Sequence, residues 1–539
     1  MQNYKLKFKI IFLAILFCGV FGMAGESFAA DVYFASSAAG SENGTDCANA
    51  YDLGDSYYGI NNASNWIAGN TLHICGTITE PYNTNAITSA GDGSFGAPIT
   101  VKFETDAVLT SPAWPNATGA IYISHNYVNV DGGTNGKIVA TLDGTIGQAC
   151  PGGTCAYQSE GTGINVAGSH CSVTKMDIEN LQIHIANTDD GDFYTATGIV
   201  TTGDNNTIYS NTIKNAECAV YISGSGTEVK NNYSQYINRH IKIGASSNSS
   251  IHDNEMSDCY NWDEPSNFYH HNGIHAFCSG TSSNVKIYDN YFDGYYSKYP
   301  SVDSHTTSFG IFLNPDGGEG CIMDGYKIFN NLFISSYDPI NYPANGRIVT
   351  GAWNHDLLTN LLVVNNTIID NGVGGIGISL TDPDGTTIVK NNLIRNDAGT
   401  FISLYGSEIP WPDLSAIDYN FYCGDADNWS NQTGAIYSFS NWNTVGVYPA
   451  GECGFDQHGS QPTVSALNLQ ANGTLGVGSA AISAGFNLTA LCSETPEICF
   501  DKNGVARPSS GLWDIGAYEY VSGESDTTPP TVPSGLAVE

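Results

Sequence analysis

Short runs of alternating apolar and polar residues fill the middle of the chain, and Gly, Asn, Asp or Ser ends each run. Such runs, about three to six residues long and rich in β-branched and aromatic residues, predict β-strands joined by tight turns. The apolar period that is typical of helices is missing. One six-residue pattern recurs, apolar-x-x-Asn-x-apolar, as in "IYSNTI", "IYDNYF" and "IFNNLF".

The recurring asparagines define an internal repeat. They are Asn211, Asn232, Asn254, Asn290, Asn331, Asn366, Asn392 and Asn420, with Asn180 as an earlier member. The shortest spacings are 21 and 22 residues, and the longer spacings carry insertions. A repeat of about 22 residues with three short strands predicts a parallel β-solenoid whose coils stack ~4.8 Å apart. Stacked asparagine amides can then hydrogen-bond from coil to coil.

These features resemble the pectate lyase-like right-handed parallel β-helix superfamily. The resemblance covers Asp31 to Tyr520 and includes the opening "DVYFASSAAGSENGTDC", the early coil "APITVKFETDAVLTS" and the asparagine ladder. The closing "DIGAYEY" looks like the last strand of such proteins. The resemblance implies an all-β fold, a single-stranded right-handed parallel β-helix with three short strands per coil. It also implies that a polysaccharide would lie along one sheet, between long loops.

The two ends of the chain differ from the repeats in composition. Residues 1–29 hold three lysines, an apolar run and "SFAA", which predicts a secretory signal peptide and an extracellular or cell-surface protein. The β-helix domain is expected over residues 31–520. Residues 521–539 turn to Ser, Thr, Pro and Gly, which marks a linker, and "PPTVPSGLAVE" resembles the first strand of a fibronectin type III domain. The same residues could also form a plain polar tail.

The net charge and the hydropathy of the chain exclude some classes of binding partner. The formal net charge is −35, a surface that repels nucleic acid and anionic lipid. After the signal peptide, no apolar segment is long enough to cross a membrane. We therefore expect a protein that does not bind nucleic acid and does not insert into a membrane, and we expect it to be a monomer. Secretion permits disulfides, and the close pairs Cys150/Cys155 and Cys492/Cys499 are the first candidates, followed by Cys47/Cys75 and Cys423/Cys453.

One strand of each coil carries the candidate chemistry. In "HIKIG" (240–244), "GIHAFC" (273–278), "GIFLN" (310–314) and "RIVTG" (347–351), the alternating apolar residues are predicted to face the core. The residues between them are predicted to lie on the outer face of one sheet: His240, Lys242, His275, Phe312, Asn314 and Arg347. This register places Lys242 and His275 in one column on successive coils. Polar residues on a solvated outer face would explain the same pattern without any function.

The longest insertions precede this strand. The segments "CYNWDEPSNFYHH" and "GYYSKYPSVDSHTT" are predicted to rise beside the sheet as walls of a cleft. Their aromatic side chains suit the apolar faces of sugar rings, although they could equally pack the loops onto the solenoid. The residues of this region that we expect to bind substrate are Trp262, Tyr269, His270, His271 and Tyr296, together with His240, Phe312 and Asn314 of the sheet.

The clustered histidines do not predict a metal site. His271 and His275 lie four residues apart on one strand, which separates them by ~13 Å, too far for one zinc ion. No cofactor is predicted, but two segments offer oxygen ligands to calcium, "NPDGGEG" (314–320) and "TDPDGTT" (381–387). Segments of this composition are also ordinary turns.

The sequence favours a polysaccharide lyase that cleaves a uronate-containing glycan by β-elimination. The candidate catalytic residues are Arg239, Lys242, His275 and Arg347. The two arginines would neutralise the uronate carboxylate, and Lys242 or His275 would remove a proton. The aspartate clusters that hold calcium in pectate lyases, and the paired carboxylates of hydrolases, are missing from the outward positions. Two alternatives stay open: a non-catalytic carbohydrate-binding or adhesive solenoid, and a uronan epimerase.

Overall fold

The structure of the protein is a computed structural model. It describes residues 29–142, 149–150, 153–154, 161–182, 196–259, 271–278, 280–296, 308–315, 320–334, 336–337, 346–351, 357–370, 375–381, 386–397, 399–405, 417–424, 429–430, 436–444 and 454–522. Residues 1–28, the residues after 522 and most of the two long insertions lie outside these ranges. In the part of the chain that is described, no helix has the length and apolarity needed to span a membrane.

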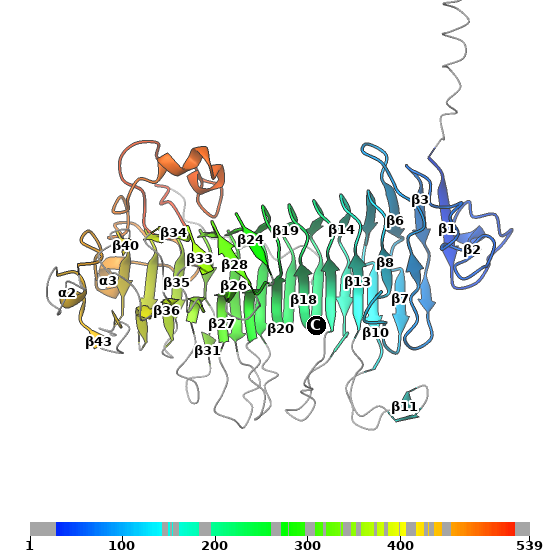
Figure 1. The fold of residues 1–539 in the computed structure, drawn as a ribbon, viewed down its shortest axis with the longest axis horizontal. Coiled ribbons are helices and arrows are strands. Elements are labelled where there is room, and N and C mark those ends of the chain that lie inside the picture. The colour runs from blue at the N-terminus through cyan, green and yellow to red at the C-terminus, as the bar shows by residue number, and fades with distance from the viewer. Residues whose placement is uncertain are drawn as a thin grey trace, which may run out of the picture.

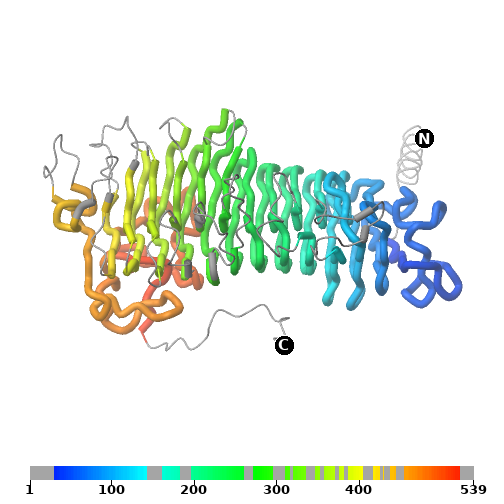
Figure 2. The backbone as a smooth tube through the Cα atoms, turned by 90° about the horizontal axis from the view of Figure 1, so that it is seen from below, coloured from blue at the N-terminus to red at the C-terminus, as the bar shows by residue number. Residues whose placement is uncertain are grey.

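The chain forms the predicted parallel β-helix, in which successive coils stack along one axis (Figures 1 and 2). Sheet A has fourteen strands and runs along the whole stack. Its strands, in spatial order, are β2 (Tyr51–Asp52), β1 (Asp31–Ala35), β3 (Thr71–Ile74), β6 (Ile99–Phe103), β9 (Val128–Asp131), β14 (Ser172–Thr174), β17 (Thr207–Tyr209), β19 (Glu228–Lys230), β21 (Ser250–His252), β25 (Lys286–Tyr288), β29 (Lys327–Phe329), β34 (Leu362–Val364), β37 (Ile388–Lys390) and β40 (Ile417–Asp418).

Two further parallel ladders close the coils. Sheet B contains β13 (Thr162–Val166), β16 (Thr197–Thr201), β18 (Thr212–Ile222), β20 (Tyr233–Ile243), β23 (His271–Ala276), β27 (Ser308–Leu313), β32 (Gly346–Thr350), β36 (Ile376–Thr381), β39 (Thr400–Tyr405) and β42 (Trp429–Ser430). Sheet C contains β4 (Thr77–Thr79), β7 (Val108–Ser111), β10 (Lys137–Ala140), β15 (Asp177–Glu179), β22 (Glu255–Cys259), β26 (Tyr291–Tyr296), β30 (Leu332–Phe333), β31 (Ser336–Tyr337), β35 (Thr367–Asp370), β38 (Leu393–Asn396) and β41 (Phe421–Cys423). The long strands β18 and β20 bend from sheet C into sheet B and belong to both.

The remaining elements are short. They are the strands β5 (Ile87–Thr88), β8 (Ile121–Ile123), β11 (Ala149–Cys150), β12 (Gly153–Thr154), β24 (Thr281–Ser283), β28 (Ile322–Asp324), β33 (Leu358–Thr359) and β43 (Ile436–Tyr437), the α-helices α2 (Phe439–Trp442) and α3 (Val464–Leu467), and the 3-10 helices η1 (Cys47–Asn49), η5 (Thr489–Ser493) and η6 (Pro496–Cys499). Inward side chains of all three sheets form one continuous hydrophobic core, which extends from Phe34 to Phe455.

The predicted asparagine ladder is confirmed for eight residues, from Asn211 to Asn420. The Oδ1 of each asparagine from Asn232 onward accepts the side-chain amide of the preceding member at 2.9–3.0 Å. It also accepts that member's backbone N–H, as Asn331 does from Asn290 at 3.1 Å. The ladder lies in the turn between sheets A and C. Its amides thus satisfy buried backbone groups that have no partner within their own strand.

The residue before each ladder asparagine adopts a left-handed conformation. These residues are Ser210, Asn231, Asp253, Asp289, Asn330, Asn365, Asn391 and Tyr419, with φ between 54° and 59°. Asn and Asp tolerate this region better than most residues because their short side chains bond locally. The Asn-Asn and Asp-Asn pairs of the sequence are thus explained by the turn, which needs a left-handed residue followed by the ladder amide.

Asn180 is not a member of the ladder, which corrects the sequence alignment. Its Oδ1 accepts the side-chain amide of Asn215 at 2.9 Å. This contact lies where the chain passes from sheet C towards sheet B, not in the turn between sheets A and C. The coil before Asn211 has Met176 in the ladder position, where the Met176 backbone N–H donates to Asn211 Oδ1 at 3.0 Å. The asparagine of "IENLQI" therefore lies four residues after the true ladder position of its coil, which is Met176.

Asp456 ends the ladder in place of a ninth asparagine. Its Oδ1 accepts the side-chain and backbone N–H groups of Asn420 at 2.8 and 3.0 Å. Its Oδ2 accepts the Tyr422 hydroxyl at 2.5 Å and the Trp442 indole N–H at 3.1 Å. Complete burial raises the pKa of Asp456 from 3.8 to about 6, although these four donors act in the opposite direction.

The buried Asp456 predicts a pH-dependent stability. Because the folded carboxyl binds its proton more tightly than the unfolded one, the stabilisation is complete below the unfolded pKa and is lost as pH rises through about 6. The loss is on the order of 3 kcal/mol. Urea unfolding at about pH 4 and pH 7 should show this change in wild type. In Asp456→Asn the change between the two pH values should be smaller by this amount, and equal changes in both proteins would contradict the prediction.

The closing "DIGAYEY" is not a strand of the solenoid, contrary to the expectation from the resemblance. It belongs to a segment, residues 485–520, that turns back over the ridge between sheets A and C (Figure 1). We call this segment the clamp. Its Leu488, Ile498 and Trp513 form a small core with apolar side chains of β25, β29 and β34. Figure 2, seen from below, shows the same orange-to-red stretch partly behind the yellow coils.

Polar contacts fix the clamp to the turns of several coils. Asn391 exchanges two hydrogen bonds with the backbone of Phe486, at 2.7 and 2.9 Å. Asn330 accepts from Arg507 Nη2 at 3.0 Å, and Lys502 Nζ donates to the carbonyl of Asp289. The clamp therefore binds the left-handed residues that precede the ladder asparagines.

Three disulfides are present among the described residues. Cys47–Cys75 and Cys492–Cys499 confirm two of the predicted pairs. Cys278–Cys321 was not predicted, and it joins neighbouring coils next to β23 and β28. Cys155 and Cys453 lie outside the described residues, so the pairs predicted for them remain predictions.

Candidate functional site

The outer face of sheet B brings Lys242 and His275 together, as the sequence predicts. The register of β20 and β23 pairs Lys242 with His275, and that of β23 and β27 pairs His275 with Phe312. One coil earlier Tyr221 pairs with Lys242, and one coil after Phe312 stands Val349. We call these five side chains the outer row. Successive members are ~4.8 Å apart along the stack.

Each polar member of the outer row rests on an aromatic neighbour. The Lys242 ammonium lies 5.5 Å from the centre of the Tyr221 ring, within the range of a cation–π contact. The His275 imidazole stacks on Phe312 with ring centres 5.3 Å apart and an angle of 11° between the planes. Lys242 is half-buried, whereas His275 and Phe312 are each 6% exposed. The row thus presents one cation and one imidazole between two aromatic faces.

The Phe312 end of the outer row leaves little room for a side chain at Gly351. A Cβ on Gly351, directly after β32, would lie 3.1 Å from both the Asn314 amide oxygen and the Phe312 ring. Asn314 is half-buried and follows β27, with its backbone N–H bonded to the Ala276 carbonyl. Asn314 therefore does stand beside the Phe312 end of the outer row, as predicted.

His240 does not lie on the outer face, and this prediction was wrong. It is fully buried, and its Nδ1 lies 2.7 Å from the Ser234 hydroxyl. Ser234 occupies an inward column in which its neighbours are Ile213 and Met256. Burial lowers the pKa of His240 to about 3, so the ring is neutral. The strand bends between sheets C and B here, and consecutive residues His240 and Ile241 both face inward.

Arg347 also points inward. The register places it in the His240 column three coils later, as predicted, but that column faces the core. Glycines occupy the two coils between, and a Cβ on Gly273 or Gly310 would come within about 2.6 Å of a core phenylalanine. Arg347 is 1% exposed, and its Nη2 lies 3.3 Å from Asp370 Oδ2. It is therefore corrected from a cleft residue to one half of a buried ion pair.

Arg239 is likewise engaged within the protein. Its Nη1 lies 2.6 Å from Glu217 Oε1, and the two side chains are 10% and 9% exposed. Buried pairs of this kind are costly to break because the remaining charge is left uncompensated. The guanidinium predicted to receive a substrate carboxylate thus already holds a carboxylate of the preceding coil.

Of the other predicted binding residues, two lie within the described residues and three lie outside them. His271 is fully buried at the start of β23, four residues from His275. The backbone of Tyr296 lies in β26, in register with Tyr337 of the next coil. Trp262, Tyr269 and His270 lie outside the described residues, as do parts of both candidate calcium segments. Within the described residues, no cluster of three or more His, Cys, Asp or Glu side chains is arranged to hold a metal ion.

Three residues of this region were missed at the sequence level. Tyr221 could have been found, because it stands in the Lys242 column one coil earlier. Glu217 and Asp370 carried a weaker signal. Each is an isolated acid in a strand, and only the three-dimensional packing shows which arginine it meets.

Comparisons with known proteins found similarity to solved structures. No protein-family model matches the chain, and no curated protein matches it. The chain is similar to the pectate lyase Pel9A at 14% identity and a TM-score of 0.39, over 92% of this chain and 97% of that one. It is similar to XylC in complex with xylose at 10% identity and a TM-score of 0.44, over 91% and 98%. It is also similar to the lacto-N-biosidase of Eubacterium ramulus at 9% identity and a TM-score of 0.43, over 81% and 68%.

Proposed function

We propose that this protein is secreted and acts on an extracellular polysaccharide, and that the outer row cleaves a uronate-containing glycan by β-elimination. The observation that carries the proposal is the placement of Lys242 and His275 on adjacent rungs, between the rings of Tyr221 and Phe312. The disulfides Cys47–Cys75, Cys278–Cys321 and Cys492–Cys499 support an oxidising compartment.

The reaction needs a positive charge, a base and a proton for the leaving oxygen. Lys242 supplies the charge, which neutralises the uronate carboxylate and makes the neighbouring C5 proton acidic. The His275 imidazole accepts that proton. The electron pair of the C5–H bond forms the C4=C5 double bond, the bond between C4 and the glycosidic oxygen breaks, and water protonates that oxygen. The faces of Tyr221 and Phe312 suit the apolar faces of the adjoining sugar rings.

A substrate screen tests this proposal. The full chain is incubated with a panel of polyuronates, and the short-wavelength ultraviolet absorbance of the unsaturated uronide is followed. We expect the absorbance to rise on at least one polyuronate and on no neutral glycan. Binding without any rise would favour the non-catalytic solenoid. Inversion at C5, seen by proton NMR without a new double bond, would favour the epimerase, which begins with the same proton abstraction.

A further inference from the structure

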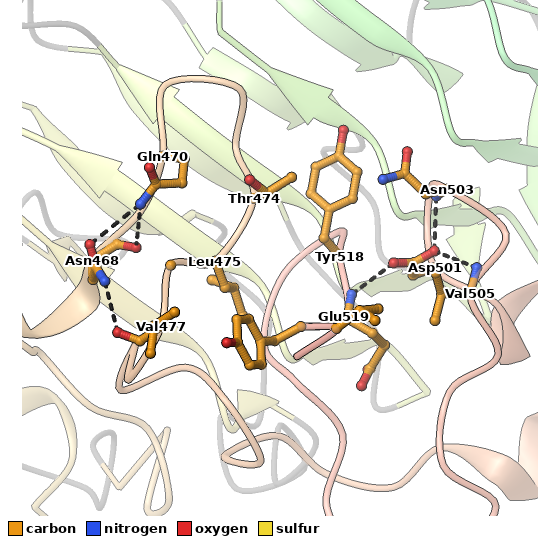
Figure 3. A pocket seen from close by; sticks show the side chains of 13 residues that line it. Asn468, Gln470, Thr474, Leu475, Val477, Asp501, Asn503, Val505, Tyr518 and Glu519 are labelled. Carbon is orange, nitrogen blue, oxygen red and sulfur yellow. Dashed lines mark hydrogen bonds between the residues drawn. The ribbon is translucent and has the colours of Figure 1, made fainter. Parts of the chain in front are cut away.

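A hollow lies between residues 468–477 and the clamp. It has a volume of about 560 Å³ and is lined by side chains of residues 468–477, of two parts of the clamp (501–505 and 518–520) and by Val521. Figure 3 shows Asn468 and Gln470 on one side and Asp501 and Asn503 on the other, with Tyr518 between them. We call this hollow the C-terminal groove. Its volume lies within the ~300–1,000 Å³ that small-molecule sites occupy.

The C-terminal groove is separate from the outer row. Tyr518 packs with Leu332 of β30, and Leu475 packs with Leu393 of β38. Both partners belong to sheet C, whereas the outer row belongs to sheet B. Because the sheets surround one core, their outer faces point in different directions. A ligand of the groove would therefore not occupy the proposed cleavage site.

The walls of the groove are fixed by hydrogen bonds. Asp501 Oδ1 accepts the backbone N–H groups of Asn503 and Val505 at 2.9 and 2.7 Å, and its Oδ2 accepts that of Glu519 at 2.8 Å. Glu519 Oε1 in turn lies 2.6 Å from Arg507 Nη1. Both carboxylates are thus used to hold the walls. A preformed site loses less conformational entropy when a ligand binds.

The lining combines apolar faces with neutral polar groups. Two tyrosines, Tyr518 and Tyr520, and two aliphatic residues, Leu475 and Val477, provide the apolar surface. Val477 is 80% exposed and so can contact a ligand at the rim. Side-chain amides at positions 468, 470 and 503 can both donate and accept hydrogen bonds.

The charge of the lining selects among ligands. Among the described residues that line the groove, the charged ones are Asp501 and Glu519, and none is Lys or Arg. An anionic sugar would meet two carboxylates, of which Glu519 is paired with Arg507, and no cation among the described lining residues would pair with the sugar. A neutral sugar meets no such cost, because its C–H faces match the tyrosines and its hydroxyls match the amides.

We propose that the C-terminal groove binds a neutral oligosaccharide without cleaving it. The site would anchor the protein to a neutral glycan, independently of the reaction proposed for the outer row. This inference rests on the lining and charge of the groove and holds whether or not the outer row is catalytic.

Calorimetric titration of the full chain tests the inference. The probes are neutral hexasaccharides of xylose, glucose, mannose and galactose, and hexasaccharides of galacturonate and mannuronate in parallel. We expect at least one neutral probe to bind. The double variant Gln470→Ala/Asn503→Ala, which changes two exposed side chains, should weaken that binding about tenfold or more through lost hydrogen bonds. Tyr520→Ala should weaken it as well.

Controls separate the groove from the outer row. Lys242→Ala should leave the affinity for the neutral probe unchanged, and the double groove variant should leave uronate binding and cleavage unchanged. The thermal midpoint of each variant is compared with wild type, so that loss of binding is not confused with loss of folding. Absence of binding across the neutral panel, neutral binding that survives the groove substitutions, or uronate binding that those substitutions remove would each overturn the inference.

Discussion

Lys242→Ala should lower the turnover of the polyuronate substrate by about 10²–10³-fold, the usual cost of removing one group that stabilises developing charge. The Lys242 ammonium is held over the Tyr221 ring and beside His275, so Ala removes the charge but leaves both aromatic neighbours in place. The backbone register that carries position 242 does not involve the side chain. We therefore expect the loss in kcat rather than in stability, measured as the initial rate of unsaturated uronide formation.

Lys214→Ala is a matched control for this experiment. Lys214 is also half-buried on an outer face, and its ammonium lies 5.8 Å from the centre of the Tyr233 ring. It belongs to the sheet C part of β18, away from the outer row, so its removal should leave turnover unchanged. His275→Ala should reduce turnover as Lys242→Ala does. If both row variants keep wild-type turnover, the assignment of the outer row as the catalytic site is wrong.

Asn331→Leu should lower the free energy of unfolding by about 3–5 kcal/mol. Asn331 sits in the middle of the ladder, and its side chain makes five hydrogen bonds. Its Oδ1 accepts two from Asn290, at 3.0 and 3.1 Å. Its amide donates to the carbonyls of Ile287 and Phe329 and to Asn366 Oδ1, at 2.9–3.1 Å. Leu has nearly the same volume but leaves these buried partners without a hydrogen bond, in a region that water does not reach.

Urea unfolding at fixed pH measures the Asn331 effect. The matched control is Asn129→Leu, which makes the same chemical change at a half-buried outer position, where the partner is Ser172 at 2.8 Å. Solvent can replace that hydrogen bond, so the control should lose less than about 1 kcal/mol. A similar loss in both variants would show that the ladder contributes no more than a surface contact.

The repeat could be predicted because it depends on spacing alone. Eight asparagines with a common local pattern define the register, and the register correctly placed Lys242 next to His275 and Arg347 in the His240 column. The direction of that column could not be predicted in the same way. It depends on the bend between the sheets and on the sizes of neighbouring core side chains. Ser234 is small enough to leave room for His240 in the core.

The partners of the arginines also required the structure. Arg239 meets Glu217 from the preceding coil, and Arg347 meets Asp370 from the following strand of sheet C. Sequence spacing gives which positions stack, but not which side chains reach around a bend. The outward placement predicted for Arg347 was wrong for this reason, and Arg239 pairs with Glu217, whereas the placement of Lys242 and His275 depends only on the straight part of the strands.

The clamp changes how the molecule would respond to a pulling force. A stack of coils loaded at its last coil would peel open one rung at a time, because each rung is held only by its neighbours. The clamp instead forms hydrogen bonds with the turns of three coils, at Asp289, Asn330 and Asn391. Tension applied through the C-terminal end is then shared among several coils in shear, so rupture must break these contacts together. A tether attached after residue 520 would thus pull on the side of the stack rather than on its end.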